Sequence, residues 1–405
     1  MALLHMATSK TLIQILFHFM NRAFFITLLF TLGILCCSAQ PYKYQSLIDT
    51  LIEKISSEQN IIKKDFYPGM FHNYRRLAAP PYNFQPDNNI FFSAIGAFTL
   101  KNIKPALNYS NQIALDTIIK KVVATYPYFK HKNGLPYYNF WPTGAPIMPN
   151  SLFFEYLTTI FIQGEDADDS AMVLMSSDAN DSTSVILKNR MNAISNLGMP
   201  NRNIKSTFKR FRKYPAFSTY LGSKMPVDFD FAVQCNLLYF TYDRRLPFSA
   251  HDKGTLDLIT KMVEERLYMK RPVYISPYYV KPSILLYHLT RLMAAFKPAS
   301  LEVFKPQLIK DLKLLQSKSN NTMEQILIST SLLRLGAASP QLIIASIADF
   351  EKSNQRKFVF FQARPAFWYR SPLKQIFLHL PYLNYQFYAP TYNKVLFLEN
   401  LVLRE

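Results

Sequence analysis

Glycine, histidine and cysteine are scarce in this chain, and their scarcity limits what the protein can be. Only 10 of 405 residues are glycine, whereas 25 are proline, a balance that favours helices separated by proline-marked loops over a turn-rich β fold. Seven scattered histidines and three cysteines include no zinc-ligand spacing such as H-E-x-x-H or paired C-x-x-C. We therefore expect an all-α protein with no metal site.

Apolar residues are abundant enough to build a large core. Hydrophobic residues make up 49% of the chain and aromatic residues 15%, well beyond the composition of a disordered protein. A chain of 405 residues could form two domains, but a single large helical domain also fits this length. We expect one domain over residues 40–405.

The N-terminus has the order of a secretory signal. Arg22 precedes an apolar run at 24–35, which is followed by the small residues of the segment Cys-Cys-Ser-Ala-Gln at 36–40. This predicts a signal peptide over residues 1–39, with Met20 as an alternative start, and a periplasmic or membrane-associated protein. A retained anchor is the other interpretation, although the run is short for a spanning helix. After cleavage Cys235 would be the one remaining thiol, so no internal disulfide could form.

Acidic and basic residues are segregated along the chain. The formal net charge is +19, yet no Lys or Arg occurs between residues 132 and 188, where seven carboxylates lie. The stretch 188–224 then contains nine Lys or Arg and no acid. No nucleic-acid-binding motif accompanies the positive charge, so we expect an anionic membrane surface or an anionic substrate group as partner, and no nucleic acid.

Several segments repeat one design, an apolar run of about a dozen residues with helical spacing. Related apolar stretches recur at intervals of roughly 40 to 60 residues, which fits one helical hairpin per repeat. Because a hairpin cannot bury its apolar stripe alone, we expect about six hairpins to stack into a single α/α toroid with an inner and an outer ring of helices. The predicted helices are 44–55, 113–124, 151–162, 170–176, 229–242, 256–267, 282–296, 302–315, 323–335, 341–350 and 392–403.

Three carboxylates crowd the run Asp166-Ala-Asp168-Asp169-Ser-Ala-Met. Asp169 or Ser170 could cap the following helix, and carboxylates suit the positive end of a helix dipole. Capping needs only one acid, however. Crowding and burial raise the pKa of one carboxyl group, which then keeps its proton at neutral pH and can act as a general acid.

The same run resembles the D-x-D-D-T-A-M signature of the class II terpene cyclases, which start their reaction by protonation. That family is built on α/α toroids and is related in fold to squalene-hopene cyclases and protein prenyltransferases. The resemblance implies that Asp168 protonates an alkene or epoxide of an apolar polyprenyl substrate, while Asp166 and Asp169 hold its proton and orientation. It implies no cofactor, although a diphosphate substrate would bring Mg²⁺ with it.

Residues that could line a substrate cavity occur in one apolar segment and in several aromatic clusters. Within segment 227–240, Asn236 must find a partner, which is either a cavity or a neighbouring helix. Aromatic faces would stabilise a carbocation, although they also simply fill a core. The candidate substrate-lining residues are Asp228, Asn236, Tyr239, Trp141, Tyr278, Tyr279, Tyr287 and Trp368.

Two other functions fit the same pattern. One is a non-catalytic toroid whose cavity holds a lipid or a peptide. The other is a carbohydrate-active α/α barrel that pairs Asp168 with Asp228 or Asp230, although two tryptophans provide few platforms for sugar stacking. The basic segment 205–213 could bind a diphosphate or membrane phosphates, or it forms a solvated loop.

Overall fold

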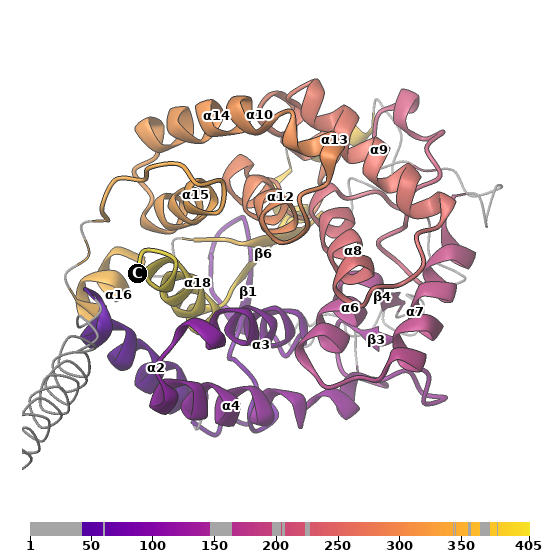
Figure 1. Ribbon diagram of the computed structural model, residues 1–405. Helices are drawn as coiled ribbons and strands as arrows, with labels where there is room; N and C mark the ends of the chain where they lie inside the picture. The colour runs from indigo at the N-terminus through magenta and orange to yellow at the C-terminus, as the bar shows by residue number, and fades with distance from the viewer. Residues whose placement is uncertain are drawn as a thin grey trace, which may run out of the picture. The chain divides into compact units, whose positions relative to one another are not determined.

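The structure, a computed structural model, describes residues 43–405 apart from 60, 146–163, 197–203, 205–206, 223–226, 343, 345, 355–357, 365–372 and 379. Within these residues the chain is mostly helical (Figure 1). The helices are α2 (Gln45–Gln59), α3 (Phe91–Ile103), α4 (Tyr109–Val123), α6 (Ala167–Ser176), α7 (Asp181–Ile194), α8 (Phe231–Asp243), α9 (Ala250–Glu264), α10 (Leu267–Lys270), α11 (Pro272–Ile275), α12 (Pro282–Phe296), α13 (Ala299–Glu302), α14 (Lys305–Lys318), α15 (Thr322–Arg334), α16 (Ile347–Asn354), α17 (Leu373–Leu378) and α18 (Pro390–Val402). The strands are β1 (Tyr74–Leu77), β2 (Gln85–Pro86), β3 (Tyr138–Asn139), β4 (Glu165–Asp166), β5 (Phe361–Ala363) and β6 (Tyr385–Tyr388).

Six helices contact one another in a closed circuit that runs α3, α6, α8, α12, α15, α18 and back to α3. In Figure 1 these six surround a common centre, and α4, α7, α9 and α14 lie outside them. Each of these outer helices packs on an inner helix that is close in sequence, such as α4 on α3 and α9 on α8. All of these helices belong to the larger of the two units into which the chain divides, Ser46–Glu405.

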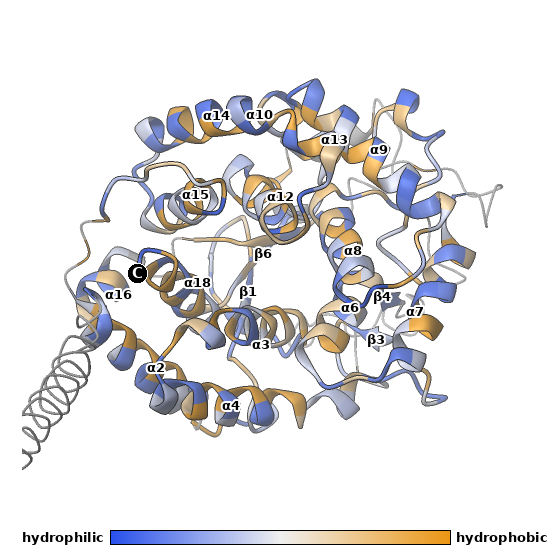
Figure 2. Ribbon diagram, viewed as in Figure 1, coloured by the Kyte–Doolittle hydropathy of each residue, from blue (hydrophilic) through white to orange (hydrophobic). Residues whose placement is uncertain are grey.

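Burial explains which helices are inside. Almost every side chain of α8 is buried, whereas α4 and α9 bury one stripe and expose the rest. Figure 2 shows the same contrast, because the outer helices are blue on the side that faces away from the centre. A helix that is apolar all round needs neighbours on every side, and the circuit provides them.

Two small sheets accompany the helices. β3 pairs with β4, and Tyr138 lies opposite Asp166. The other sheet has the order β2-β1-β6-β5, and its β1–β6 pair joins the beginning of Ser46–Glu405 to its end. Both sheets are antiparallel, and both border the site described below.

The structure is mostly helical and most of the predicted helices are present, but the expected all-α class did not include the two small sheets. The long helices α3 and α7 were missed, as were the short helices α10, α11 and α13. The sequence indicated no helix at α3 and none between residues 180 and 226, where α7 in fact begins after a cap at Asn180. The predicted helix 341–350 was also wrong in its first half, because α16 begins only at Ile347.

Three sequence predictions fall outside the described residues. They are the signal peptide 1–39, the helix 151–162 and Trp368. In the part of the chain that the structure describes, no helix has both the length and the hydropathy of a membrane span.

Candidate active site

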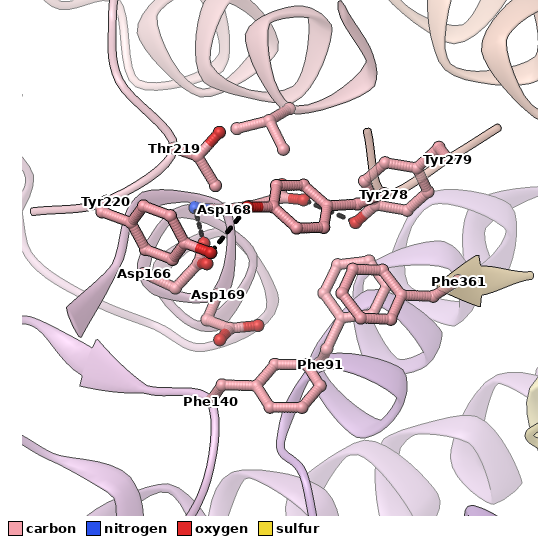
Figure 3. A pocket seen from close by; sticks show the side chains of 11 residues that line it. Phe91, Phe140, Asp166, Asp168, Asp169, Thr219, Tyr220, Tyr278, Tyr279 and Phe361 are labelled. Carbon is pink, nitrogen blue, oxygen red and sulfur yellow. Dashed lines mark hydrogen bonds between the residues drawn. The ribbon is translucent and has the colours of Figure 1, made fainter. Parts of the chain in front are cut away.

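A pocket lies where the N-terminal ends of inner helices converge (Figure 3). α3 begins at Phe91, α6 begins at Ala167, and the segment before α12 contributes two tyrosines. The positive ends of helix dipoles therefore face this pocket, which favours carboxylates there. Its lining consists of Phe91, Phe140, Asp166, Asp168, Asp169, Thr219, Tyr220, Val233, Tyr278, Tyr279 and Phe361.

The pocket is small and aromatic. Its cavity volume is about 30 Å³. Ligand pockets occupy roughly 300 to 1,000 Å³, so this cavity is about tenfold smaller than the usual range. Six of its lining residues are Phe or Tyr, and the acids come from the first turn of α6 alone.

The first acid of the run, Asp166, is the cap of α6. Its Oδ1 accepts a hydrogen bond of 2.9 Å from the backbone N–H of Asp168. The sequence had placed the cap at Asp169 or Ser170, but the helix begins earlier because Asp166 has extended backbone angles and Ala167 is already helical. Burial, followed by the charge of Asp168, raises the pKa of Asp166 well above its usual range.

Asp168 is 3% exposed and is hydrogen-bonded at both carboxyl oxygens. Asn236 Nδ2 donates to Oδ1 over 2.7 Å, and the Tyr279 hydroxyl donates to Oδ2 over 2.8 Å. Burial raises the pKa of Asp168 to about 6, while the bonds from Tyr279 and Asn236 and the charge of Arg291 limit the rise. Hydrogen bonds of this kind stabilise the charged form.

Asn236 connects Asp168 to a buried cation. The Asn236 Oδ1 accepts a hydrogen bond of 2.5 Å from Arg291 Nη2, and His288 Nδ1 lies 2.9 Å from the same oxygen. Because that oxygen faces donors, the amide nitrogen of Asn236 is fixed toward Asp168. The partner that the sequence required for Asn236 is therefore found on neighbouring helices, α6 and α12.

Asp169 differs from its neighbours because its carboxyl group has no hydrogen-bond partner among the residues that the structure describes. The residue is 1% exposed, and neither oxygen has a hydrogen-bond partner within the described part of the chain. Figure 3 shows the carboxyl group pointing into the pocket, near the ring of Phe140. Burial, followed by the charges of Asp166 and Asp168, raises the pKa of Asp169 well above its usual range. Burial without a hydrogen-bond partner thus favours the protonated form of this group.

Two further aspartates lie beside the pocket, at the start of α8. Asp230 caps α8 at Ala232 and Val233, and it also accepts hydrogen bonds from Ser276 Oγ (2.7 Å) and Tyr278 N–H (3.0 Å). Burial raises the pKa of Asp230 to about 7. This carboxyl group thus holds in place the segment that carries the two pocket tyrosines.

Asp228 is buried next to a pair of pocket tyrosines. The hydroxyl groups of Tyr220 and Tyr278 are 2.7 Å apart. Burial raises the pKa of both hydroxyls, and the negative charge of Asp228 raises it further. The pair is therefore neutral and presents hydroxyl groups to the pocket.

Of the predicted lining residues that the structure describes, Tyr278 and Tyr279 alone join the acids in the pocket wall. Tyr239 instead packs edge-on against Phe98 and Phe296, and Tyr287 donates to Glu399 over 2.7 Å. Trp141 donates from its Nε1 to Asp87, away from the acids. Each of these contacts belongs to the core.

Several residues that complete the site were not predicted. Thr219 and Tyr220 reach the pocket from a segment for which the sequence indicated neither a helix nor a site residue. Arg291 could have been recognised, because it is the one charged residue between Pro282 and Phe296, an otherwise apolar helix. A charge in such a place needs a partner.

Among the described residues, no three His, Cys, Asp or Glu side chains gather in a way that could hold a metal ion. Comparison of the sequence with protein-family models and with curated proteins finds no match. The function therefore has to follow from the chemistry of the site itself.

Proposed function

We propose that the chain is an α/α toroid of the terpenoid cyclase and protein prenyltransferase type. The closed circuit of six helices, with outer helices packed against them, supports this fold. The converging N-terminal ends of the inner helices support it as well, because they create one central place for a ligand.

The function that fits this site best is protonation-initiated cyclisation of an apolar polyprenyl substrate, in the manner of a class II terpene cyclase. One observation carries the proposal: a buried carboxyl group without a hydrogen-bond partner among the described residues faces a pocket walled by aromatic rings, and this burial favours its protonated form. The carboxyl group supplies the proton, and the ring faces stabilise the carbocation that forms. This step requires no metal ion, although a diphosphate group on the substrate would bring Mg²⁺.

The size of the pocket limits how a substrate is held. The pocket has a cavity volume of about 30 Å³, enough for one or two water molecules. Binding of the reacting end of a polyprenyl chain therefore requires the side chains of the pocket wall to move apart. Its small size and its aromatic wall argue against a carbohydrate-active barrel, which needs a wide polar groove.

Location and partners remain predictions that fit this function. An exported or membrane-associated protein would meet an apolar lipid substrate at the membrane, and the net charge of +19 would attract the protein to an anionic surface.

The test is incubation of the purified full-length protein with linear polyprenyl hydrocarbons, alcohols and diphosphates of different lengths, followed by mass spectrometry of the products. We expect cyclic products from the wild type and none from the double variant Asp168→Asn/Asp169→Asn. The matched control is Asp178→Asn, because Asp178 follows α6 but is fully exposed. The proposal is wrong if no substrate is cyclised, or if the double variant is as active as the wild type.

A further inference from the structure

We infer that Asp169, rather than Asp168, donates the proton, and that Asp168 remains a carboxylate that serves as the counter-ion of Arg291 across Asn236. This inference rests on the proposed function and departs from the assignment that the D-x-D-D pattern implies. The two carboxyl groups are adjacent in sequence, yet their surroundings differ completely.

Asp168 is held by donors that favour its charged form. Both of its oxygens accept a hydrogen bond, one from the Asn236 amide and one from the Tyr279 hydroxyl. The amide cannot reverse without turning its nitrogen toward Arg291 Nη2, which also has only hydrogens to offer. The hydrogen bond from Asn236 is therefore fixed in the direction that stabilises the carboxylate.

The charges between the inner helices lead to the same conclusion. Arg334 forms an ion pair with Glu399, so the charges of these two residues balance each other. Arg291 is only 5% exposed, and it forms no direct ion pair with any carboxylate in the described residues. A guanidinium group is always charged. The positive charge of Arg291 is therefore balanced by the negative charge of Asp168, to which Asn236 connects it.

Asp169 has the opposite environment. Neither of its oxygens has a partner within the described residues, and the carboxyl group points into the pocket. A buried carboxylate without hydrogen bonds or a cation is costly, so the neutral acid is the stable form. All three acids of the run line the pocket, but Asp166 and Asp168 accept hydrogen bonds that stabilise their charged forms, and Asp169 accepts none from the described residues.

In the reaction, the O–H bond of Asp169 breaks, and its proton forms a C–H bond with the π electrons of the substrate alkene. The positive charge stays on the neighbouring carbon, and Asp169 becomes a carboxylate. The fixed Asp168 carboxylate and the aromatic rings stabilise this cation. After cyclisation the last carbocation loses a proton to water, and Asp169 takes a proton from water, so the overall reaction is an isomerisation.

Several other titratable groups surround Asp169. Asp166 and Asp168 lie on its own helix, and their charges raise its pKa. From other elements, the groups near the pocket are Asp228, Asp230, Tyr220, Tyr278 and Tyr279, with Arg291 behind Asn236. The groups other than Arg291 are acids, and a neighbouring acid does not favour the ionisation of Asp169.

The pH dependence of turnover distinguishes the two donors. A general acid works only while it is protonated, so the rate is present below its pKa and lost as the pH rises through that value. If Asp168 were the donor, the rate would fall near pH 6, because its pKa is about 6. With Asp169 as the donor, we expect a level rate through pH 6 and a fall only at clearly higher pH.

Single variants provide a second comparison, with far-UV circular dichroism as the check of folding. We expect Asp169→Asn to lose at least about 100-fold in rate, the usual contribution of a general acid. Asp168→Asn keeps the proton donor but loses a carboxylate that stabilises the cation, so its rate should decrease less than that of Asp169→Asn. Its rate should also fall at lower pH than in the wild type, because one negative charge beside Asp169 is gone. An active Asp169→Asn with an inactive Asp168→Asn would overturn the inference, as would a wild-type rate that falls near pH 6. If both variants are inactive, the pH dependence of the wild-type rate decides between Asp168 and Asp169 as the donor.

Infrared difference spectroscopy at pH 7 separates this inference from the proposed function, since it needs no turnover. Wild type minus Asp169→Asn should show the loss of a protonated carboxyl band, and wild type minus Asp168→Asn the loss of a carboxylate band. The reverse pattern would refute the assignment of the proton. If the expected pattern is found but no polyprenyl is cyclised, the proton assignment stands and the cyclase proposal fails.

Discussion

Replacement of Arg291 by methionine tests whether this arginine and Asp168 form a charge pair across Asn236. Methionine keeps most of the volume of the side chain and its contact with the ring of Phe98, over which the guanidinium lies at 5.0 Å. It removes the hydrogen bond to Asn236 and the only cation that acts on Asp168 in the described residues. Removal of one partner of a buried pair lowers the free energy of unfolding by about 3–5 kcal/mol, and we expect a loss of this size at pH 7.

The loss should depend on pH. The pKa of Asp168 in the folded protein is about 6, against an ordinary value of 3.8, so its ionisation in the fold costs about 3 kcal/mol at pH 7. Since the folded pKa is the higher one, this group contributes stability below pH 4 that is lost as the pH rises toward 6. At pH 5 Asp168 is mostly protonated and has little need of a cation. We therefore expect Arg291→Met to cost at least about 1 kcal/mol less at pH 5 than at pH 7, which corresponds to about one pKa unit.

Urea unfolding followed by circular dichroism at both pH values measures these differences, with comparable m-values as the sign that the same transition is observed. Arg210→Met is the control, because Arg210 is about half exposed and its ion pair with Glu265 lies at the surface. Such a pair contributes about 0–1 kcal/mol. An equal loss at pH 5 and pH 7 for Arg291→Met, or a loss below about 1 kcal/mol at pH 7, would refute the pairing of Arg291 with Asp168.

Three other substitutions have defined outcomes. Asp230→Ala removes a helix cap and two further hydrogen bonds, so we predict a decrease of about 2–4 kcal/mol in the free energy of unfolding in urea; an unchanged midpoint would contradict the role of Asp230. Gly254→Ala would place a methyl group 2.3 Å from the carbonyl oxygen of Pro215, so we predict a loss of at least about 1–3 kcal/mol, measured in the same way; a neutral effect would mean that the two segments can separate. Phe361→Ala removes part of the aromatic wall, and we predict slower cyclisation with a changed product pattern in mass spectrometry, whereas identical products would exclude Phe361 from contact with the cation.

Periodicity located most of the long helices of the described chain, but not α3 and α7. α8, α12, α15 and α18 were predicted within a few residues. α3 resembles α8 in being buried on nearly every side, and it has polar residues at both ends, so its own pattern does not explain why it was missed. α7 lies in a segment rich in polar and basic residues. The one sign of its start is the capping residue Asn180, and a single capping residue is too little to predict a helix.

The candidate site was predictable as a location but not as a mechanism. The crowded acids of the run 166–169 indicated where chemistry could occur. The sequence could not show that Tyr279, 111 residues away, and Asn236, 68 residues away, hold Asp168 while Asp169 stays free. Those differences depend on long-range packing, which determines the state of each carboxyl group and has no local pattern.

The pairing of β1 with β6 has a consequence for how the protein is made. Tyr74 lies opposite Tyr388, so the β1–β6 pair can form only after residue 388 has been synthesised. β5, which carries Phe361 into the pocket, is held by β6 and therefore takes its place at the same late moment. Contacts so distant in sequence form slowly, so a nascent chain with its acids already in place still lacks the wall that shields them. Deletion of the last 20 residues would leave such an unfinished, water-filled site, so the C-terminus is part of the active-site architecture although it contributes no acid.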